Sequence, residues 1–213
     1  MLVGNDVVDL RDPENQPEAI HQRFDRRVFT PAERARLCME ATAHRTRWRM
    51  WAAKESAFKV ARKLDPRVRF LPRSFSVHPV GNARSIVRHS LGRFEVSFSG
   101  AEDWVHAIAT PSFGPGVEAL RRGPLAVIER VQQGKSAAAN ASVRVRAMAR
   151  SAIGSALSIS PSEIRIVTAD SIPAALWKKL PLPVDLSLSH HGRFLACAWS
   201  RLPVPDLRAE ETG

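Results

Sequence analysis

The longest regular pattern of apolar residues in this chain spans residues 43–64. Apolar side chains recur there at spacings of three and four positions, at Met50, Ala53, Ala57, Val60 and Leu64. This spacing matches the turn of an α-helix and puts these side chains on one face. The pattern predicts one long amphipathic helix over this stretch.

Shorter stretches alternate apolar and polar residues, which is typical of β-strands. We predict strands over residues 2–10, 74–78, 85–89, 93–98, 105–110, 162–168, 184–188 and 194–199. We predict further helices over residues 18–28, 31–42, about 117–132 and about 143–157, and a short helix or turn over 173–180. Thr30, Pro31 and Glu33 form a capping signature at the start of the second of these helices. This mixture of helices and hairpin-forming strands predicts an α+β fold.

An internal repeat predicts two related halves. Residues 94–109 and 184–199 align without a gap, with matching apolar positions and with Ser-x-Ser after an acidic residue in each copy. Any two hairpins share the alternation, but the paired serines with their flanking acid favour a duplication. Residues 111–116 (PSFGPG) suit a linker. We therefore predict halves over 1–112 and 113–213, each an antiparallel sheet plus a long helix, packed with pseudo-twofold symmetry.

The charge of the chain is strongly positive. Its 213 residues include 32 Lys+Arg and 21 Asp+Glu, which gives a formal net charge of +11. A nucleic-acid-binding protein would account for this charge, but the basic residues form no tail and no aromatic-rich patch. They are spread evenly, with 19 basic and 13 acidic residues up to position 112 and 13 and 8 after it. An acidic protein partner or a polyphosphate ligand fits this distribution equally well.

Three classes of protein are disfavoured by the remaining composition. No apolar run approaches the roughly 20 residues of a membrane span. The first residues, MLVGNDVVDL, carry acids where a signal peptide carries positive charge. The two cysteines, Cys38 and Cys197, provide neither a disulfide framework nor zinc-ligand spacing. We expect a soluble, cytoplasmic protein.

Two acids near the N-terminus are candidate metal ligands. Asp6 and Asp9 follow Gly4 in the first predicted strand. Carboxylates at such a place, together with a glutamate from a helix, suit Mg²⁺, which takes few protein ligands and completes its shell with water and phosphate oxygens. The alternative for Asp6 alone is a turn-forming or capping acid.

The long helix carries a second candidate group. Glu55 and Lys59 are one turn apart in the order that favours an ion pair. An exposed salt bridge is the plain alternative, but Trp51 and Phe58 flank Glu55 and favour partial burial. Lys54 points about 100° away around the helix, toward another part of any ligand.

A third group follows the strand 184–188. Ser189, His190 and His191 enter a turn at Gly192, where a hydroxyl and imidazoles suit an anion such as phosphate. Arg150, with Arg146 one turn before it, adds a candidate phosphate contact. For each of these residues a solvated surface position is the alternative.

Together these segments resemble the 4′-phosphopantetheinyl transferase superfamily. Its patterns are a strand with G-x-D-x-x-E/D, an F-T-P-x-E segment, a helix with W/F-x-x-K-E-x-x-x-K, and a strand ending S-x-S-H. They correspond here to Gly4–Asp9, Phe29–Glu33, Trp51–Lys59 and Ser187–His190. The first three look like the holo-acyl-carrier-protein synthase type, whereas the two halves are similar to the longer, monomeric members. The halves run in swapped order here, and Ile172 stands before Pro173 where long members often have Lys.

The resemblance implies a reaction and roles for these residues. It implies transfer of 4′-phosphopantetheine from coenzyme A to a carrier-protein serine, with release of 3′,5′-ADP. Mg²⁺ would be held by Asp6 and Glu55, with Asp9 directly or through water, and Glu55 or a metal-ordered water would be the base. Lys59 would stabilise the pyrophosphate, and Ser189 and His190 would bind the nucleotide end. Further phosphate contacts are implied for Lys54 and Arg150.

The implied partners are coenzyme A and an acidic acyl or peptidyl carrier protein of fatty-acid, polyketide or nonribosomal-peptide synthesis. Neither nucleic acid nor membrane is expected as a partner, and the protein is expected to be a monomer of two halves. Two alternatives stay open at this point. The first is a non-catalytic relative that binds coenzyme A, and the second is a basic nucleic-acid-binding protein.

Overall fold

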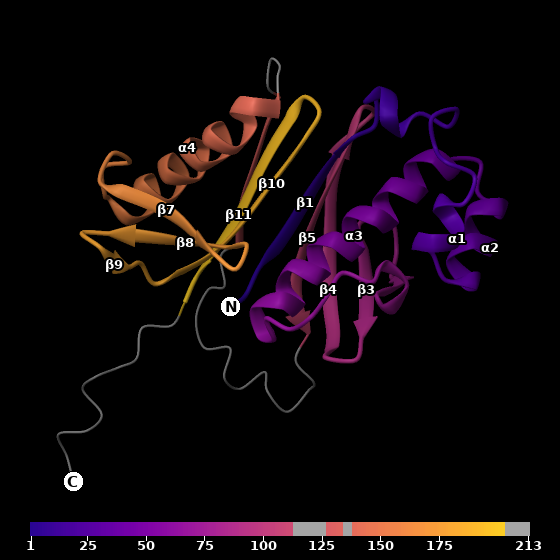
Figure 1. Ribbon diagram of the computed structural model, residues 1–213, viewed down its shortest axis with the longest axis horizontal. Coiled ribbons are helices and arrows are strands. Elements are labelled where there is room, and N and C mark those ends of the chain that lie inside the picture. Colours follow the sequence, from indigo (N-terminus) through magenta and orange to yellow (C-terminus); the bar gives the residue numbers. More distant parts are fainter. Residues whose placement is uncertain (113–126, 134–137, 203–213) are drawn as a thin grey trace, which may run out of the picture.

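A computed structural model describes residues 1–112, 127–133 and 138–202 of the chain (Figure 1). The first of these segments folds into one antiparallel sheet with the strand order β1-β5-β4-β3-β2. Its strands are β1 (Gly4–Asp9), β2 (Ser76–Pro79), β3 (Arg84–His89), β4 (Gly92–Ala101) and β5 (Trp104–Ser112). All five strands predicted for this stretch are confirmed, with ends that differ by a few residues.

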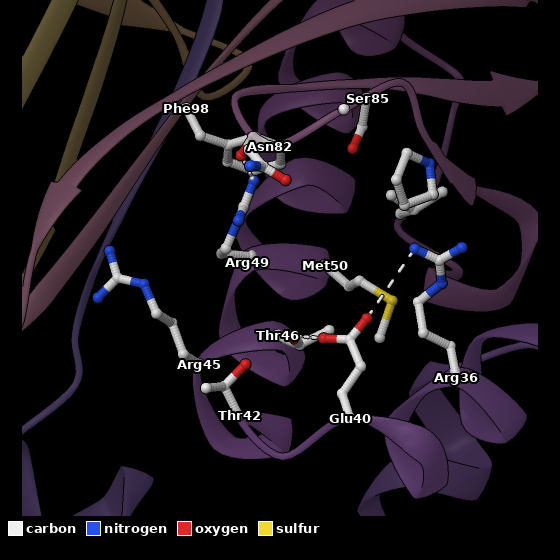
Figure 2. A pocket seen from close by; sticks show the side chains of 13 residues that line it. Arg36, Glu40, Thr42, Arg45, Thr46, Arg49, Met50, Asn82, Ser85 and Phe98 are labelled. Carbon is white, nitrogen blue, oxygen red and sulfur yellow. Dashed lines mark hydrogen bonds and ion pairs between the residues drawn. The ribbon is translucent and has the colours of Figure 1, made fainter.

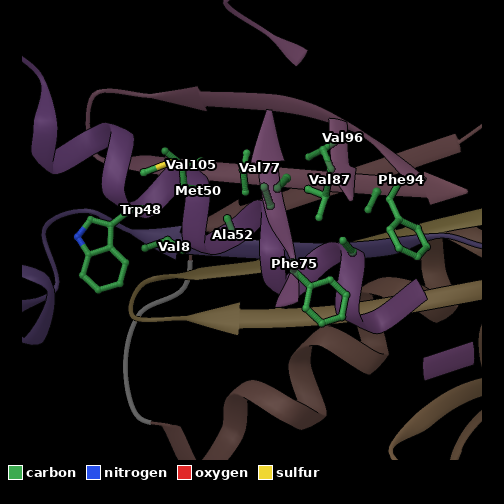
Figure 3. Packing of buried hydrophobic residues seen from close by; sticks show 14 of the residues in the cluster. Val8, Trp48, Met50, Ala52, Phe75, Val77, Val87, Phe94, Val96 and Val105 are labelled. Carbon is green, nitrogen blue, oxygen red and sulfur yellow. The ribbon is translucent and has the colours of Figure 1, made fainter. Parts of the chain in front are cut away.

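Helix α3 (Ala43–Leu64) lies across one face of this sheet (Figure 1). Its predicted bounds are confirmed, and four of the five residues in the predicted stripe are buried. The fifth, Leu64, is 48% exposed at the end of the helix. The buried face of α3 and the sheet enclose a core that includes Trp48, Phe75 and Phe94 (Figure 3).

Shorter helices gather at the end of the first half that lies away from β10 (Figure 1). They are α1 (Phe24–Val28) and α2 (Pro31–Met39). The single turns η1 (Pro13–Asn15) and η2 (Pro72–Ser74) complete the helical elements of this segment. The predicted capping of α2 is confirmed, because Thr30 and Glu33 each accept a hydrogen bond from the other's backbone N–H. Helix α1 is shorter than the helix predicted over 18–28.

The second half contains two three-stranded sheets and one long helix, α4 (Ala138–Leu157). One sheet has the order β10-β11-β6 and the other β7-β8-β9. Their strands are β6 (Val127–Gln133), β7 (Ile164–Ala169), β8 (Ile172–Trp177), β9 (Leu180–Pro181), β10 (Val184–His191) and β11 (Phe194–Arg201). Helix α4 packs on these sheets over a second core that includes Ile153, Leu186 and Trp199.

Three predictions for the second half are corrected. Residues 173–180 form strand β8 and the start of β9 instead of a short helix or turn. Residues 127–133 form a strand paired with β11 and not the end of a helix, while the rest of that predicted helix, 117–126, lies outside the described residues. Helix α4 also begins five residues before the predicted 143. Residues 113–116 of the predicted linker lie outside the described residues as well, and β5 continues to Ser112.

The repeat detected in the sequence corresponds to two hairpins of identical register. Phe98 lies opposite Ala107 in β4–β5, and Leu188 lies opposite Cys197 in β10–β11. The order of elements along the chain is also shared, β1-α3-β2-β3-β4-β5 in the first half and β6-α4-β7-β8-β10-β11 in the second. These observations confirm an α+β fold of two halves. The pseudo-twofold relation and the boundary at residue 112 stay predictions. In the described part of the chain, no helix is long and apolar enough to cross a membrane.

Candidate functional site

Strands β1 and β10 lie side by side and join the two halves (Figure 1). From Val3, just before β1, to Asp9 at its end, every second backbone N–H donates a hydrogen bond to a side chain of β10. The pairs are Val3 to Asp185 at 2.6 Å, Asn5 to Ser187 at 2.9 Å, Val7 to Ser189 at 3.2 Å, and Asp9 to Nδ1 of His191 at 3.2 Å. The acid and the two serines of the second repeat copy therefore satisfy the free edge of β1, which would otherwise leave buried donors unpaired. We call this contact the seam.

Gly4 allows α3 to approach β1 closely. A Cβ at this position would lie 2.1 Å from the backbone oxygen of Ser56 and 2.9 Å from the Val60 side chain. Only glycine avoids that overlap. The close approach brings Lys59, one turn beyond Ser56, against the backbone and side chains of β1.

The carboxylate of Asp6 is held from both halves. Its Oδ1 accepts a hydrogen bond from the Lys59 ammonium at 3.0 Å and another from the Ser189 hydroxyl at 2.8 Å. Lys59 also donates to the backbone oxygen of Asn5 at 2.7 Å. The predicted Glu55–Lys59 pair is therefore corrected, because Lys59 makes its ion pair with Asp6.

Glu55 is half-buried on α3 near this pair. Burial and the nearby Asp6 carboxylate together raise the pKa of Glu55 to about 7, against the opposing effect of Lys59. Two close carboxylates of this kind carry more negative charge than Lys59 alone neutralises. Mg²⁺ binds through one or two carboxylates and fills its remaining positions with water and phosphate oxygens. Asp6 and Glu55 therefore fit a Mg²⁺ ion, although among the described residues no group of three or more His, Cys, Asp or Glu forms a preassembled metal site.

The carboxylate of Asp9 makes an ion pair across the seam. Both of its carboxylate oxygens accept hydrogen bonds from the Arg193 guanidinium, at 2.8 and 2.7 Å, and its Oδ2 also accepts the backbone N–H of Arg193. Burial alone would raise the pKa of Asp9, but the hydrogen bonds from Arg193 and Arg11 lower it overall. Residues three apart in a strand also face opposite sides, so Asp9 points away from Asp6. This ion pair across the seam occupies both carboxylate oxygens of Asp9, and the expected contact of Asp9 with the metal, directly or through water, stays a prediction.

Lys54 lies inside the first half and has no access to a ligand. Its side chain is fully buried, and its ammonium donates to both oxygens of Glu33 at 2.9 Å and to the backbone oxygens of Pro72 and Phe75. Glu33 in turn accepts the backbone N–H of Val77 at 2.7 Å. The pair thus ties α2, α3 and β2 together. This burial corrects the expectation that Lys54 contacts coenzyme A.

His190 lies at the exposed end of β10, next to Ser189. Partial burial of the ring lowers the pKa of His190, and the positive charges of Lys59 and Arg146 lower it further. Arg146 is therefore a basic neighbour of His190, and the phosphate contact expected of Arg150 stays a prediction.

A cavity of about 170 Å³ opens at the seam beside Lys59. It is lined by Phe58, Lys59 and Arg62 of α3, by Ser171, Ile172 and Pro173 around the β7–β8 turn, and by Ser187 and Leu188 of β10. The Nε of Arg62 is buried there without a hydrogen-bond partner among the described residues. Sequence reasoning missed Arg62, although its position one turn after Lys59 on the same helical face could have indicated it. Lys59 and Arg62 give the cavity the character of an anion site.

Comparison with known proteins shows the family of the chain. A profile of the 4′-phosphopantetheinyl transferase superfamily matches residues 2–109, just over half of the chain. A holo-[acyl-carrier-protein] synthase from Methylobacterium sp. (strain 4-46) is 42% identical over 57 residues, which are 27% of this chain and 42% of that protein. The match therefore spans less than half the length of this curated relative.

Two solved structures are also similar in part. The holo-[acyl-carrier-protein] synthase of Neisseria meningitidis superposes with a TM-score of 0.44 and 20% identity over 53% of this chain and 100% of that one. That of Thermotoga maritima gives a TM-score of 0.40 and 15% identity over 84% of this chain and 83% of that one. The family assignment rests on the profile, whose matched residues run from the start of the first sheet through α3 and into β5. By that match, the chain belongs to the 4′-phosphopantetheinyl transferase superfamily.

Proposed function

We propose that this protein transfers 4′-phosphopantetheine from coenzyme A to a serine of an apo carrier protein. The observation that carries the proposal is the seam, where Lys59 and Arg62 line a cavity beside the carboxylate of Asp6. Two cations next to two carboxylates can hold a pyrophosphate and a divalent ion together. Membership in the superfamily supports the same reaction class.

In the proposed site, Asp6 and Glu55 hold Mg²⁺. When bound, the ion neutralises charge on the pyrophosphate and on the leaving group. Ser189 and Lys59 orient the Asp6 carboxylate through the hydrogen bonds described above. Asp9 fixes the seam through Arg193 and does not coordinate the ion.

Lys59 and Arg62 are proposed to contact the pyrophosphate, Lys59 as a point charge and Arg62 through its fork of N–H donors. His190, Ser189 and Arg146 are proposed to lie near the nucleotide phosphate. Glu55 accepts the proton of the carrier serine at a carboxylate oxygen. The serine oxygen then bonds to the phosphorus that carries pantetheine, the phosphoanhydride bond breaks, and 3′,5′-ADP leaves.

The proposed acceptor is an acidic acyl or peptidyl carrier protein. A protein of net charge +11 attracts an acidic partner and steers the encounter. We further propose that the enzyme acts in the cytoplasm as a monomer whose two halves share this one site.

The test is incubation of the protein with coenzyme A, Mg²⁺ and a panel of apo carriers, followed by mass spectrometry of each carrier. We expect a mass gain of one phosphopantetheine on at least one carrier. Asp6→Asn and Glu55→Gln should abolish the gain, whereas Glu163→Gln, an exposed carboxyl at the start of the β7 region, should retain it. Circular dichroism of each variant checks that the fold is intact.

Two results would contradict the proposal in different ways. Measurable binding of coenzyme A with no transfer to any carrier would indicate the non-catalytic relative. Salt-sensitive binding of nucleic acid, with no affinity for coenzyme A, would reject both the transfer reaction and the non-catalytic relative that binds coenzyme A.

A further inference from the structure

A second hollow lies in the first half, outside the seam (Figure 2). Its volume is about 270 Å³. It is framed by the end of α2, the first turns of α3, the β2–β3 turn and β4, with Arg36, Glu40, Arg45, Thr46, Arg49 and Asn82 among its lining residues. We call it the arginine hollow. Neither the seam chemistry nor the proposed transfer uses it.

Two guanidinium groups of the arginine hollow form no ion pair with any carboxylate of the described residues. Arg45 donates to the backbone oxygen of Ala101 and Arg49 to that of Asn82. Each guanidinium has five N–H donors, so most donors of both remain available. Within residues 1–112, no carboxylate lies at ion-pair distance from either arginine. The Arg49 guanidinium also lies 4.5 Å from the centre of the Phe98 ring.

The single carboxylate in the arginine hollow is already engaged. Glu40 accepts a hydrogen bond from the Thr46 hydroxyl and forms an ion pair with Arg36 at 4.0 Å. Figure 2 shows its carboxylate between these two partners, while Arg45 and Arg49 extend from α3 toward the other part of the hollow. Among the described residues Glu40 makes no ion pair with Arg45 or Arg49, although its charge partly offsets that of Arg49.

Like charges one helical turn apart destabilise each other. Burial lowers the pKa of Arg49 and the neighbouring Arg45 lowers it further, while the charge of Glu40 opposes both effects in part. The first turn of α3 adds to the positive potential, because its N-cap Thr42 makes no side-chain hydrogen bond to the free N–H groups there. An anion in this hollow would offset the repulsion between Arg45 and Arg49, the buried charge of Arg49 and the positive potential at the start of α3.

The internal repeat gives independent support. Gly100 occupies the repeat position that His190 occupies in the second half, and a Cβ at Gly100 would lie 3.1 Å from the Arg45 guanidinium. His190 likewise has a basic neighbour, Arg146, from the long helix of its own half. In each half, a basic side chain of the long helix therefore lies next to the same position of the repeated hairpin.

We propose that the arginine hollow binds a phosphate-type oxyanion, either inorganic phosphate or the phosphate group of a small ester, through Arg45 and Arg49. Its volume is just below the roughly 300 Å³ at which pockets for drug-sized ligands begin. This size favours a single phosphate group over a whole dinucleotide. The hydroxyls of Thr42, Thr46 and Ser85 line the same hollow and can donate to the remaining oxygens.

The arginine hollow is separate from the seam. Arg45 and Arg49 lie on the first two turns of α3, whereas Glu55 and Lys59 lie at least about 9 Å further along the helix axis. The proposal therefore stands or fails independently of the proposed transfer reaction.

The test is titration of the full chain with inorganic phosphate and, separately, with AMP as a simple phosphate ester, at constant ionic strength without Mg²⁺. Binding is followed through the NMR signals of the arginine Nε–Hε groups and through the thermal midpoint. We expect saturable shifts of the Arg45 and Arg49 signals and a rise in the midpoint, because a ligand that binds only the folded state stabilises it. Tighter binding of AMP than of phosphate would identify an ester as the ligand.

Four variants distinguish phosphate binding in the arginine hollow from binding at the seam. Arg45→Gln/Arg49→Gln should weaken phosphate binding at least tenfold, and Arg45→Lys/Arg49→Lys should restore part of it if the double glutamine variant folds poorly. Arg26→Gln/Arg27→Gln, a matched pair of exposed arginines, should bind as the wild type does. Lys59→Met should leave the Arg45 and Arg49 shifts unchanged. Equal affinity of the wild type and of Arg45→Gln/Arg49→Gln, or shifts confined to seam residues, would overturn the proposal.

Discussion

The hydroxyl of Ser189 donates a hydrogen bond to the carboxylate of Asp6 at 2.8 Å, although the two residues are 183 positions apart in the chain. The same hydroxyl accepts the backbone N–H of Val7. Ser189 therefore couples the edge of β1 to the orientation of its candidate metal ligand. The first half contains both carboxylates of the site, but one of them is positioned by the second half.

Replacing Ser189 by alanine should affect both stability and catalysis. Ser189→Ala leaves the Val7 N–H and one Asp6 oxygen without this partner, and an unsatisfied buried polar group costs about 1 to 3 kcal/mol. We expect a loss of that size in urea unfolding and roughly a tenfold fall in kcat, since tenfold corresponds to about 1.4 kcal/mol. Ser187→Ala is the matched comparison, because Ser187 accepts the Asn5 N–H but does not touch Asp6. Equal kcat for the two variants would show that Ser189 does not act through Asp6.

The Lys54–Glu33 pair should support the fold and not substrate binding. Lys54→Met leaves a buried glutamate without its cation, and breaking a buried pair in this way costs about 3 to 5 kcal/mol. Changing both residues, in Lys54→Met/Glu33→Gln, should recover part of this loss, which a double-mutant cycle in urea would measure. Normal stability of Lys54→Met together with a raised KM for coenzyme A would instead support the expectation that Lys54 contacts coenzyme A.

The local features of the fold followed from sequence, whereas its long-range pairings did not. The 3-4 spacing of α3 fixed both ends of that helix, and the Thr30–Glu33 signature fixed the start of α2. The β7–β8 hairpin was missed because its turn uses Asp170 and Ser171 at positive φ, in place of the Asn-Gly or Asp-Gly signal of such turns.

In the candidate site, too, the sequence predicted local features better than long-range contacts. Local spacing identified Asp6, Glu55 and Lys59 but paired Lys59 with the wrong carboxylate. The Lys54–Glu33 and Asp9–Arg193 contacts join residues 21 and 184 positions apart. No periodicity along the chain contains that information, because these contacts depend on how α2 and the β10–β11 turn pack.

His89 should make the stability of the first half depend on pH. Its ring stacks on Phe75 with 4.3 Å between centroids, and its Nδ1 accepts the backbone N–H of Leu91. Burial lowers the pKa of His89 below its ordinary value of 6.5. Because the unfolded chain binds the proton more readily, this contribution is complete above about pH 6.5 and is lost as the pH falls through the folded pKa.

Urea unfolding between about pH 8 and about pH 5, where histidine changes charge, measures this effect. The difference in unfolding free energy between the wild type and His89→Phe should shrink or reverse in favour of the variant as the pH falls, since phenylalanine keeps the stack but cannot be protonated. A pH-independent difference would mean that His89 does not titrate differently in the folded and unfolded states.

The contact with Arg193 indicates a structural role for Asp9, whereas Asp6, three residues before it, is the proposed metal ligand. The Asp9 side chain is buried, and Arg193 contacts both of its oxygens. Asp9→Asn should therefore lower the unfolding free energy by about 3 to 5 kcal/mol while leaving Mg²⁺ affinity per folded molecule within about twofold. Asp6→Asn should instead weaken Mg²⁺ binding per folded molecule far more than twofold, because its carboxylate is proposed to bind the ion. Isothermal titration with Mg²⁺ and urea unfolding of both variants give the four values needed. If Asp9→Asn instead loses Mg²⁺ binding at full stability, Asp9 must exchange Arg193 for the metal, and the seam must open when the ion binds.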